Sequence, residues 1–218
     1  MPVCIVVGAG AVELELPAAK AGEFVIAADG GVKALENRGL RWDLALGDFD
    51  SLGRVPEGGE VLRYPAEKDE TDMHLALREG FARGYRRFVI YGGLGGRLDH
   101  SLANLQLLRG LAEQGGRGFL VSADTVATAV TDGALYFGPD MRGTVSVLCA
   151  GDRAEGVTLT GLRYPLTDAV LTGGVPLGMS NEFTGVPACV SVFGGTLWVL
   201  WQENARALLT RLRAEEEA

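Results

Sequence analysis

The sequence predicts an α/β fold in which an N-terminal parallel-sheet domain is followed by a small antiparallel β-sandwich or barrel domain. Apolar runs with strand character alternate with helical candidates in the first part of the chain, which is typical of parallel strands covered by helices. Past Thr131 the apolar runs are short and β-rich, and Gly and Pro separate them without a long helical period. We place the boundary within 131–143, which gives predicted domains at 1–132 and 143–218.

The first domain is expected to contain both parallel strands and amphipathic helices. Five apolar runs predict its strands: Val3–Val7, Phe24–Ala28, Leu44–Leu46, Phe88–Ile90 and Phe119–Val121. Between Asp69 and Tyr85, the residues Met73, Leu77 and Phe81 recur four apart and form an apolar stripe on one helix face. The segment from Leu98 to Gln114 repeats this pattern, so a second helix is expected there.

The second domain is expected to be built mainly from short strands. Four β-rich runs predict them: Thr144–Leu148, Gly156–Leu159, Ala188–Phe193 and Thr196–Trp201. Leucines at 208, 209 and 212 predict a closing helix from Glu203 to Arg213.

Composition excludes several classes of protein. With 218 residues, of which 47% are hydrophobic and 22% charged, the chain can bury a sizeable core. A net charge of -8 argues against a nucleic-acid surface, which normally carries a basic stripe. Cys4, Cys149 and Cys189 are odd in number and far apart, so we expect neither a disulfide framework nor a zinc knuckle. No apolar run reaches the ~18 residues that a membrane span requires. We therefore expect a cytoplasmic protein without a membrane or nucleic-acid partner.

A glycine-rich stretch between a predicted strand and a predicted helix is the strongest local signal. It runs from Tyr91 to Leu105 and contains glycines at 92, 93, 95 and 96, followed by Arg97. Glycines let a backbone approach an anion closely, and a helix N-terminus adds free N–H groups, so this stretch favours phosphate binding. The alternative is a tight turn in which Asp99 or Ser101 caps the helix. The incomplete fingerprint Gly8-Ala9-Gly10 is interpreted as an ordinary turn, because Glu13 stands at its third glycine position.

Acidic residues gather where predicted strands end, which is the edge at which ligands bind in an open parallel sheet. Asp29 closes the second predicted strand, and Asp48 and Asp50 follow the third, two apart, so that both project to one side of an extended segment. Converging carboxylates repel one another unless a cation lies among them, and Mg²⁺ bound by carboxylates and substrate phosphates is a common solution. The alternatives are turn-forming aspartates, or Asp69 as a helix cap with Asp72 as its partner.

These segments, taken together and in this order, resemble the thiamine pyrophosphokinase family. The resemblance lies in these stretches: Ala28-Asp29-Gly30-Gly31, Gly47-Asp48-Phe49-Asp50-Ser51, Lys68-Asp69-Glu70-Thr71-Asp72, Gly92-Gly93-Leu94-Gly95-Gly96-Arg97-Leu98-Asp99-His100 with Asn104, Gly161-Leu162-Arg163-Tyr164-Pro165-Leu166 and Ser180-Asn181-Glu182-Phe183. The resemblance implies a homodimer with active sites between its subunits. It also implies an enzyme that transfers the pyrophosphoryl group of ATP to the hydroxyethyl group of thiamine, with Mg²⁺, to give thiamine diphosphate and AMP.

The resemblance also implies roles for individual residues. Metal-binding residues are expected to be Asp48, Asp50 and Asp99, and catalytic residues Asp72, Asp50, Asp99 and Arg97. ATP is expected to contact Asp29, Lys68, Thr71, Gly92, Gly93, Gly95, Gly96, His100 and Asn104. Ser180 and Asn181 are expected to hydrogen-bond the aminopyrimidine of thiamine, and Tyr164 to contact one of its rings. Trp198 and Trp201 are further candidates for ring contact, although alternating strand aromatics are more often core residues.

Two other functions remain open from the residues. The first keeps the chemistry and replaces thiamine by a hydroxymethylpterin, since only the Ser180-Asn181 segment argues for thiamine. The second is a nucleotide-sensing module without turnover. Such a module is expected to have lost carboxylates, whereas every acidic position of these segments is filled.

Overall fold

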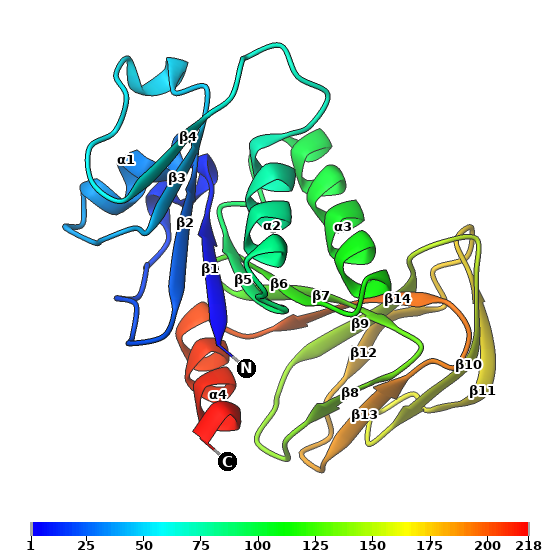
Figure 1. The fold of residues 1–218 in the computed structure, drawn as a ribbon. Coiled ribbons are helices and arrows are strands. Elements are labelled where there is room, and N and C mark those ends of the chain that lie inside the picture. The colour runs from blue at the N-terminus through cyan, green and yellow to red at the C-terminus, as the bar shows by residue number, and fades with distance from the viewer. Residues whose placement is uncertain (1, 218) are drawn as a thin grey trace.

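A computed structural model of the chain describes residues 2–217, with side chains except at 12, 13, 51, 216 and 217. Six parallel strands form one part of a ten-stranded sheet, in the order β4-β3-β2-β1-β5-β6 (Figure 1). These strands are β1 (Val3–Val7), β2 (Phe24–Ala28), β3 (Leu44–Gly47), β4 (Glu60–Arg63), β5 (Arg87–Tyr91) and β6 (Arg117–Val121). The predicted parallel sheet is therefore confirmed, with β1 and β2 at their predicted bounds.

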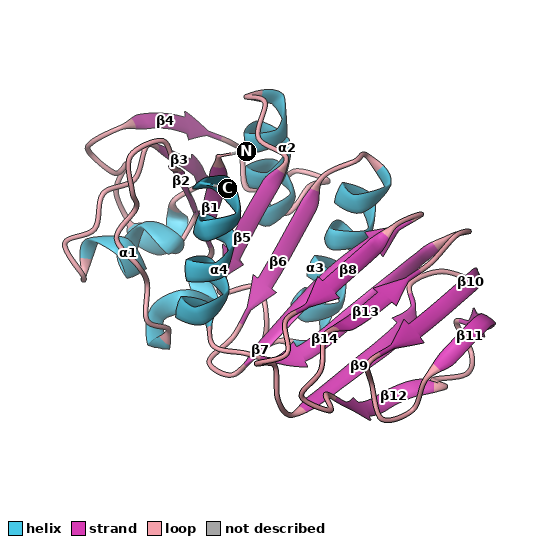
Figure 2. Cartoon of the chain, turned by 90° about the horizontal axis from the view of Figure 1, so that it is seen from below, coloured by secondary structure: helices cyan, strands magenta, loops and turns pink. Residues whose placement is uncertain are grey.

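Antiparallel strands extend this sheet beyond β6 in the order β7-β14-β9-β12. They are β7 (Thr125–Thr131), β14 (Thr196–Gln202), β9 (Thr144–Cys149) and β12 (Gly178–Glu182). A second, four-stranded antiparallel sheet contains β11 (Leu166–Thr172), β10 (Arg153–Thr160), β13 (Ala188–Ser191) and β8 (Ala134–Phe137). Figure 2 shows these four strands layered against the antiparallel part of the large sheet.

Helices cover both faces of the parallel strands. They are α1 (Gly31–Glu36), α2 (Asp72–Ala82), α3 (Leu98–Glu113) and α4 (Ala205–Glu217), with short 3₁₀ turns at η1 (Ala9–Glu13) and η2 (Asp50–Leu52). Side chains of β1 alternate between the two faces: Ile5 packs in the cluster that contains Leu209 of α4, and Val6 packs in the cluster that contains Leu77 of α2. Because both faces are covered, β1 is a continuous apolar run without polar alternation.

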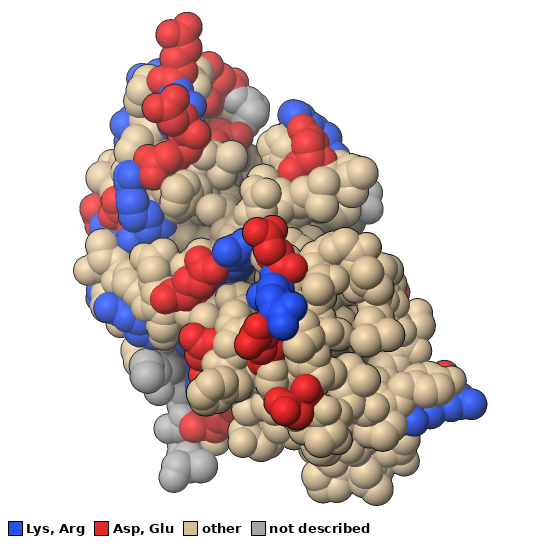
Figure 3. Space-filling model, turned by 90° about the vertical axis from the view of Figure 1, so that its right-hand side faces the viewer, with Lys and Arg blue, Asp and Glu red and all other residues tan. Residues whose placement is uncertain are grey.

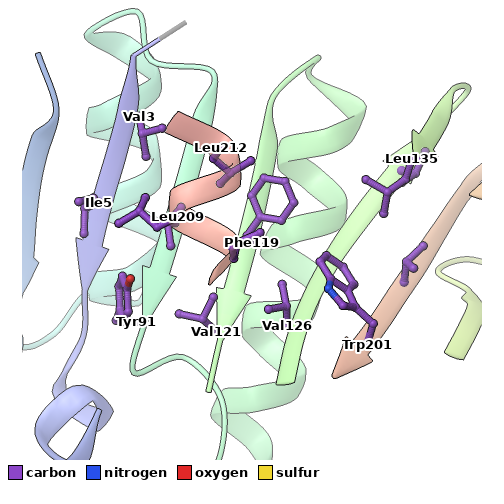
Figure 4. Packing of buried hydrophobic residues seen from close by; sticks show 14 of the residues in the cluster. Val3, Ile5, Tyr91, Phe119, Val121, Val126, Leu135, Trp201, Leu209 and Leu212 are labelled. Carbon is purple, nitrogen blue, oxygen red and sulfur yellow. The ribbon is translucent and has the colours of Figure 1, made fainter. Parts of the chain in front are cut away.

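Figure 4 shows the core on the α4 side, where Phe119, Leu209 and Leu212 lie over the sheet. This core continues between the two sheets, where the Phe137 and Trp201 rings meet edge to face with centroids 5.3 Å apart. The predicted sandwich is thus confirmed, and it shares the large sheet with the parallel strands. The predicted boundary 131–143 contains β8, so the division at 132 and 143 remains a prediction. None of the helices within residues 2–217 could cross a bilayer.

Candidate active site

A cavity of about 750 Å³ opens at the carboxyl ends of the parallel strands. The loops that follow β1, β2, β3 and β5 form its walls together with the segment before α2 and the start of α3. Its lining residues are Gly8, Ala9, Gly10, Ala28, Asp29, Asp48, Ala66, Lys68, Glu70, Thr71, Asp72, Met73, Gly92, Gly93, Gly95, Arg97, Asp99, His100, Ala103 and Asn104. Most of the residues expected to face nucleotide and metal therefore lie around one space, as the position of ligand sites in open parallel sheets predicts.

The glycine-rich turn after β5 packs directly on the turn after β1. Gly92 has φ 75°, and a Cβ there would lie 2.4 Å from the amide nitrogen of Ala11 and 2.7 Å from the carbonyl oxygen of Gly8. A Cβ on Gly10 would in turn lie 2.7 Å from the carbonyl oxygen of Gly92. Only glycine fits such a close backbone approach. Gly8 and Gly10 line the cavity, which we did not predict, although their place after the central strand of a parallel sheet was a usable signal.

The side chain of Asn104 fixes the glycine-rich turn by a hydrogen bond to its backbone. The buried Asn104 side chain donates from Nδ2 to the carbonyl oxygen of Gly93, over 2.8 Å. His100 is exposed at the cavity, one turn earlier on α3. Neither Asp99 nor Ser101 caps the helix: Arg97 is its N-cap residue without a side-chain cap, and the Ser101 hydroxyl lies 3.3 Å from the carbonyl oxygen of Arg97. The capping alternative is therefore wrong.

Three carboxylates and one ammonium group meet on the opposite wall. Lys68 Nζ lies 3.1 Å from Asp72 Oδ1 and 3.9 Å from Asp48 Oδ2. Asp29 adopts φ 44° after β2, and a Cβ on Gly47 would come within 3.1 Å of it, so the β2 and β3 loops touch here. Lys68 therefore lies among carboxylates at the cavity, and its contact with ATP stays a prediction.

The carboxyl group of Asp72 carries the clearest electrostatic perturbation of this wall. Burial raises the pKa of Asp72, and the negative charges of Asp29 and Asp48 raise it further, against the opposing effect of Lys68. A carboxylate in such surroundings is a stronger base than an exposed one, and it attracts cations. Asp72 begins α2, and the cap is Thr71, whose hydroxyl oxygen accepts from the amide of His74. The alternative in which Asp69 caps this helix is therefore wrong.

Arg97 lies on the solvent side of the cavity and pairs with Asp99. Its Nη2 is 2.6 Å from Asp99 Oδ2, and the Arg97 side chain is 72% exposed. The hydrogen bond from Arg97 holds the pKa of Asp99 below its usual range. Because exposed ion pairs contribute little to stability, this pair can separate when a phosphate competes for the guanidinium group.

The expected extended segment at Asp48 and Asp50 is absent, and that interpretation is corrected. Phe49 has φ 61° and its ring is buried, so the backbone turns sharply between the two aspartates. Asp48 Oδ1 accepts from the amide of Asp50 over 2.9 Å, which is the pattern of an Asx turn. Asp48 lines the cavity, whereas Asp50 is exposed and is not among the lining residues.

The residues expected to contact thiamine lie elsewhere, in the β-rich half. None of Ser180, Asn181 and Tyr164 lines the cavity. Asn181 is 3% exposed, and its side chain clamps both backbone polar groups of Tyr164: Oδ1 accepts from the Tyr164 amide over 2.9 Å and Nδ2 donates to the Tyr164 carbonyl over 2.7 Å. Tyr164 itself is 57% exposed. In one chain, Asn181 therefore positions the loop that carries an exposed aromatic ring.

Both tryptophans of β14 are held by the fold. Trp201 is buried, and Nε1 of Trp198 donates to the carbonyl oxygen of Leu105 on α3 over 3.0 Å. Trp201 follows the core interpretation of strand aromatics, whereas ring contact by the half-buried Trp198 stays a prediction.

The carboxylate oxygens of the cavity suit a hard cation whose remaining ligands are substrate phosphates and water. Within the described side chains of residues 2–217, no three His, Cys, Asp or Glu residues form a ready-made metal centre. Mg²⁺ needs only one or two carboxylates when substrate phosphates and water complete its octahedron. The cavity supplies such oxygen donors from Asp48 and Asp72, and it has room for a triphosphate.

Comparison with known proteins agrees with this geometry. Residues 18–119 match the catalytic domain of thiamin pyrophosphokinase, and residues 135–197 match its vitamin B1 binding domain. A thiamine pyrophosphokinase of Bacillus subtilis is 32% identical over 164 residues, which are 72% of this chain and 77% of that protein.

Solved structures give the same result over almost the full length. A crystal structure of thiamine pyrophosphokinase from Bacillus subtilis superposes with a TM-score of 0.80 and 27% identity, covering 94% of this chain and 100% of that chain. The thiamin pyrophosphokinase of Geobacillus thermodenitrificans gives a TM-score of 0.79 and 30% identity, covering 94% and 99%. The pattern of glycines and carboxylates, the cavity that they line and these likenesses together show that the chain belongs to the thiamin pyrophosphokinase family.

Proposed function

We propose that this kinase transfers the pyrophosphoryl group of ATP to the hydroxyethyl oxygen of thiamine, giving thiamine diphosphate and AMP. The alcohol oxygen forms a bond to the β-phosphorus, the bond from that phosphorus to the α,β-bridging oxygen breaks, and AMP leaves with that oxygen. The observation that carries the proposal is the single cavity at which the glycine-rich turn faces Asp29, Asp48 and Asp72. Such transfers depend on positioning and charge stabilisation more than on covalent help from the protein.

The phosphate groups are assigned to the glycine-rich wall. Gly92, Gly93, Gly95, Arg97 and His100 line the cavity along it, and Gly96 belongs to the same turn. Thr71 lines the cavity beside Asp72 and would add a hydroxyl contact from there. Asn104 keeps the turn in place through its bond to Gly93. Free amides before a helix and a mobile exposed guanidinium form a suitable cradle for a polyanion.

The carboxylate wall is assigned to metal and acceptor. Asp48 of this wall would hold Mg²⁺ directly or through water, together with the exposed Asp50 and with Asp99 at the start of α3, and Asp29 would support them. Magnesium bound there would neutralise charge on the triphosphate and on the departing AMP. Asp72 would orient the alcohol and accept its proton, a role that its raised pKa supports.

The thiamine-binding residues are assigned to a second copy of the chain. Ser180 and Tyr164 are exposed and do not line the cavity of their own chain, which supports a homodimer with composite sites. Large exposed apolar side chains are also frequent in this half: Tyr136, Tyr164, Val170, Val175, Leu177, Met179, Val186 and Phe193. Figure 3 shows large uncharged areas on one face of the molecule. Such exposed apolar surface favours association. Three free thiols support a reducing, cytoplasmic location.

The reaction is tested by incubating the protein with ATP, Mg²⁺ and a panel of thiamine and hydroxymethylpterin alcohols, followed by detection of AMP. We expect AMP and thiamine diphosphate in equal amounts with thiamine, and no AMP above background with the pterin. AMP production with the pterin alone would transfer the proposal to that acceptor. ADP as the nucleotide product would contradict transfer of the pyrophosphoryl group.

The composite site is tested by mixing two inactive variants, Asp72→Asn and Ser180→Trp. If each site uses Asp72 of one copy and Ser180 of the other, mixed dimers regain one intact site. Random exchange then restores about a quarter of the wild-type activity. A mixture that stays inactive after demonstrated subunit exchange would place both residues in the site of one chain.

A further inference from the structure

The two cations of the cavity are placed very differently. Arg97 is exposed and pairs with the equally exposed Asp99. The side chain of Lys68, by contrast, is only 14% exposed, and its ammonium group lies 3.1 Å from Asp72 and 3.9 Å from Asp48. Lys68 thus occupies the carboxylate wall.

A backbone contact fixes the ammonium group at this place. Lys68 Nζ donates to the carbonyl oxygen of Pro65 over 3.1 Å, in addition to its contacts with Asp72 and Asp48. The bond to Pro65 is a hydrogen bond, whereas the contacts with Asp72 and Asp48 are ion pairs, so the ammonium group is held by one backbone bond and two opposite charges. The arrangement is a bound counter-ion, in which one charge is shared between two carboxylates and anchored to the loop before α2.

The carboxylates need such a counter-ion when no metal is bound. Asp29, Asp48 and Asp72 come from three different loops that meet at one wall, and Asp72 is partly buried. Like charges in this arrangement repel one another strongly in a medium of low polarity. A divalent cation that arrives alone must displace Lys68 and leave its ammonium group without a partner in a half-buried position.

We propose that Lys68 is the resident counter-ion of Asp48 and Asp72 and that it suppresses metal binding until nucleotide arrives. This inference rests on the proposed use of ATP and Mg²⁺. A metal–nucleotide complex brings phosphates that accept the displaced ammonium group, so that Lys68 exchanges one anion for another. The metal therefore enters together with the triphosphate. Before it enters, Lys68 keeps Asp48 and Asp72 close together.

The test measures binding of Mn²⁺ alone, by electron paramagnetic resonance, to the full chain without nucleotide. Lys68→Met should bind Mn²⁺ at least about tenfold more tightly than the wild type, because an opposing cation within ~4 Å is removed. Lys33→Met removes the same charge from the exposed surface of α1 and should leave Mn²⁺ affinity unchanged. Lys68→Arg should keep the weak affinity. Equal affinities of Lys68→Met and Lys33→Met would overturn the proposal.

Thermal unfolding gives a second, independent readout. In metal-free buffer, Lys68→Met should melt below the wild type and recover on addition of Mn²⁺. In an Asp72→Asn background the same substitution should cost less, because the carboxylate that needs the counter-ion is gone. An equal fall in melting temperature on Lys68→Met substitution in both backgrounds would contradict the counter-ion role. If the proposed function is wrong, the wild type will form no AMP in the assay described above. That result is distinct from the metal-binding and melting results, which test the counter-ion role alone.

Discussion

The two halves of the molecule present functional residues in opposite ways. In the parallel half, residues from six segments converge on one cavity, because parallel strands bring all their carboxyl ends to one edge. In the antiparallel half, strand ends alternate between two edges, and Tyr164 and Ser180 stay exposed away from that cavity. The comparison teaches that the parallel half forms its cavity within one chain, whereas the residues proposed to bind thiamine would complete a site only against the surface of a second copy.

The largest loss of activity from a substitution in the parallel half is expected at Asp72. Asp72→Asn keeps the shape of the side chain and removes both its basicity and its negative charge, so kcat for AMP formation should fall by roughly 10³-fold. Steady-state assays of AMP at saturating ATP and thiamine measure this. Asp69→Asn is the matched control, because Asp69 is exposed and outside the cavity lining. Similar losses in both variants would remove the special role of Asp72.

Asp50 tests whether the metal site extends beyond the residues that line the cavity. Asp50→Asn should abolish AMP production to within detection, by at least about 10²-fold, while circular dichroism and melting stay close to wild type. The Asx turn at Asp48 would have to bring Asp50 toward the metal when substrate binds. Near-normal turnover of the variant at low Mg²⁺ would exclude Asp50 from the metal site.

Ser180 sharpens the division of labour between the halves. Ser180→Ala removes one hydrogen-bonding group from β12, and should raise the KM for thiamine about tenfold with the KM for ATP unchanged. Initial rates with each substrate varied in turn measure both constants. Thr184→Ala, in the loop that follows β12, is the control: the Thr184 hydroxyl donates to the carbonyl oxygen of Gly161, so its removal should leave both KM values unchanged. A change confined to the KM for ATP would reverse the assignment of the two halves.

The smallest expected effect concerns stability, at the contact between the last helix and the parallel half. Arg213 of α4 bonds both oxygens of buried Glu23, each over 2.7 Å. Burial raises the pKa of Glu23, but Arg213 and the amide of Lys20 outweigh it, so the pKa is below its ordinary value. A carboxyl group whose pKa is lower in the folded chain stabilises the fold at pH values above its pKa in the unfolded chain, which is about 4.3. This stabilisation is lost as the pH falls through the pKa of the folded chain.

Glu23→Gln should therefore reduce the free energy of unfolding at pH 7 by roughly 2 kcal/mol, with the difference from wild type shrinking below about pH 4. Urea unfolding at several pH values measures it. Glu113→Gln, which removes an exposed helix pair with Arg109, should change stability by less than about 0.5 kcal/mol. A Glu23 effect that does not depend on pH would indicate lost packing rather than lost charge.

Sequence reasoning located some of the buried strands, although it missed the largely buried strand β7. β1 and β2 were predicted with their bounds because both faces of these strands are covered, which leaves uninterrupted apolar runs. β4 was missed because it is a short edge strand with charged residues at both ends, and β12 because its pairing with β9 is irregular and three of its side chains are polar. Neither strand has the apolar pattern that marks a strand in sequence.

For the site, the sequence identified most of the lining residues but not their contacts. The turn at Phe49 could not be foreseen, because its left-handed backbone is favoured only by burial of the ring in the folded core. The partner of Lys68 could not be foreseen either, since it depends on how three loops meet in space. The counter-ion role proposed for Lys68 comes from this tertiary detail.

The most direct measurement is a crystal structure with Mn²⁺ and a non-hydrolysable ATP analogue, in which anomalous scattering locates the metal. The account predicts Mn²⁺ bound to Asp48 beside Asp72, the triphosphate along the turn from Gly92 to Gly96, and Lys68 moved onto a phosphate oxygen. A triphosphate bound outside this cavity, or Mn²⁺ far from both aspartates, would contradict it.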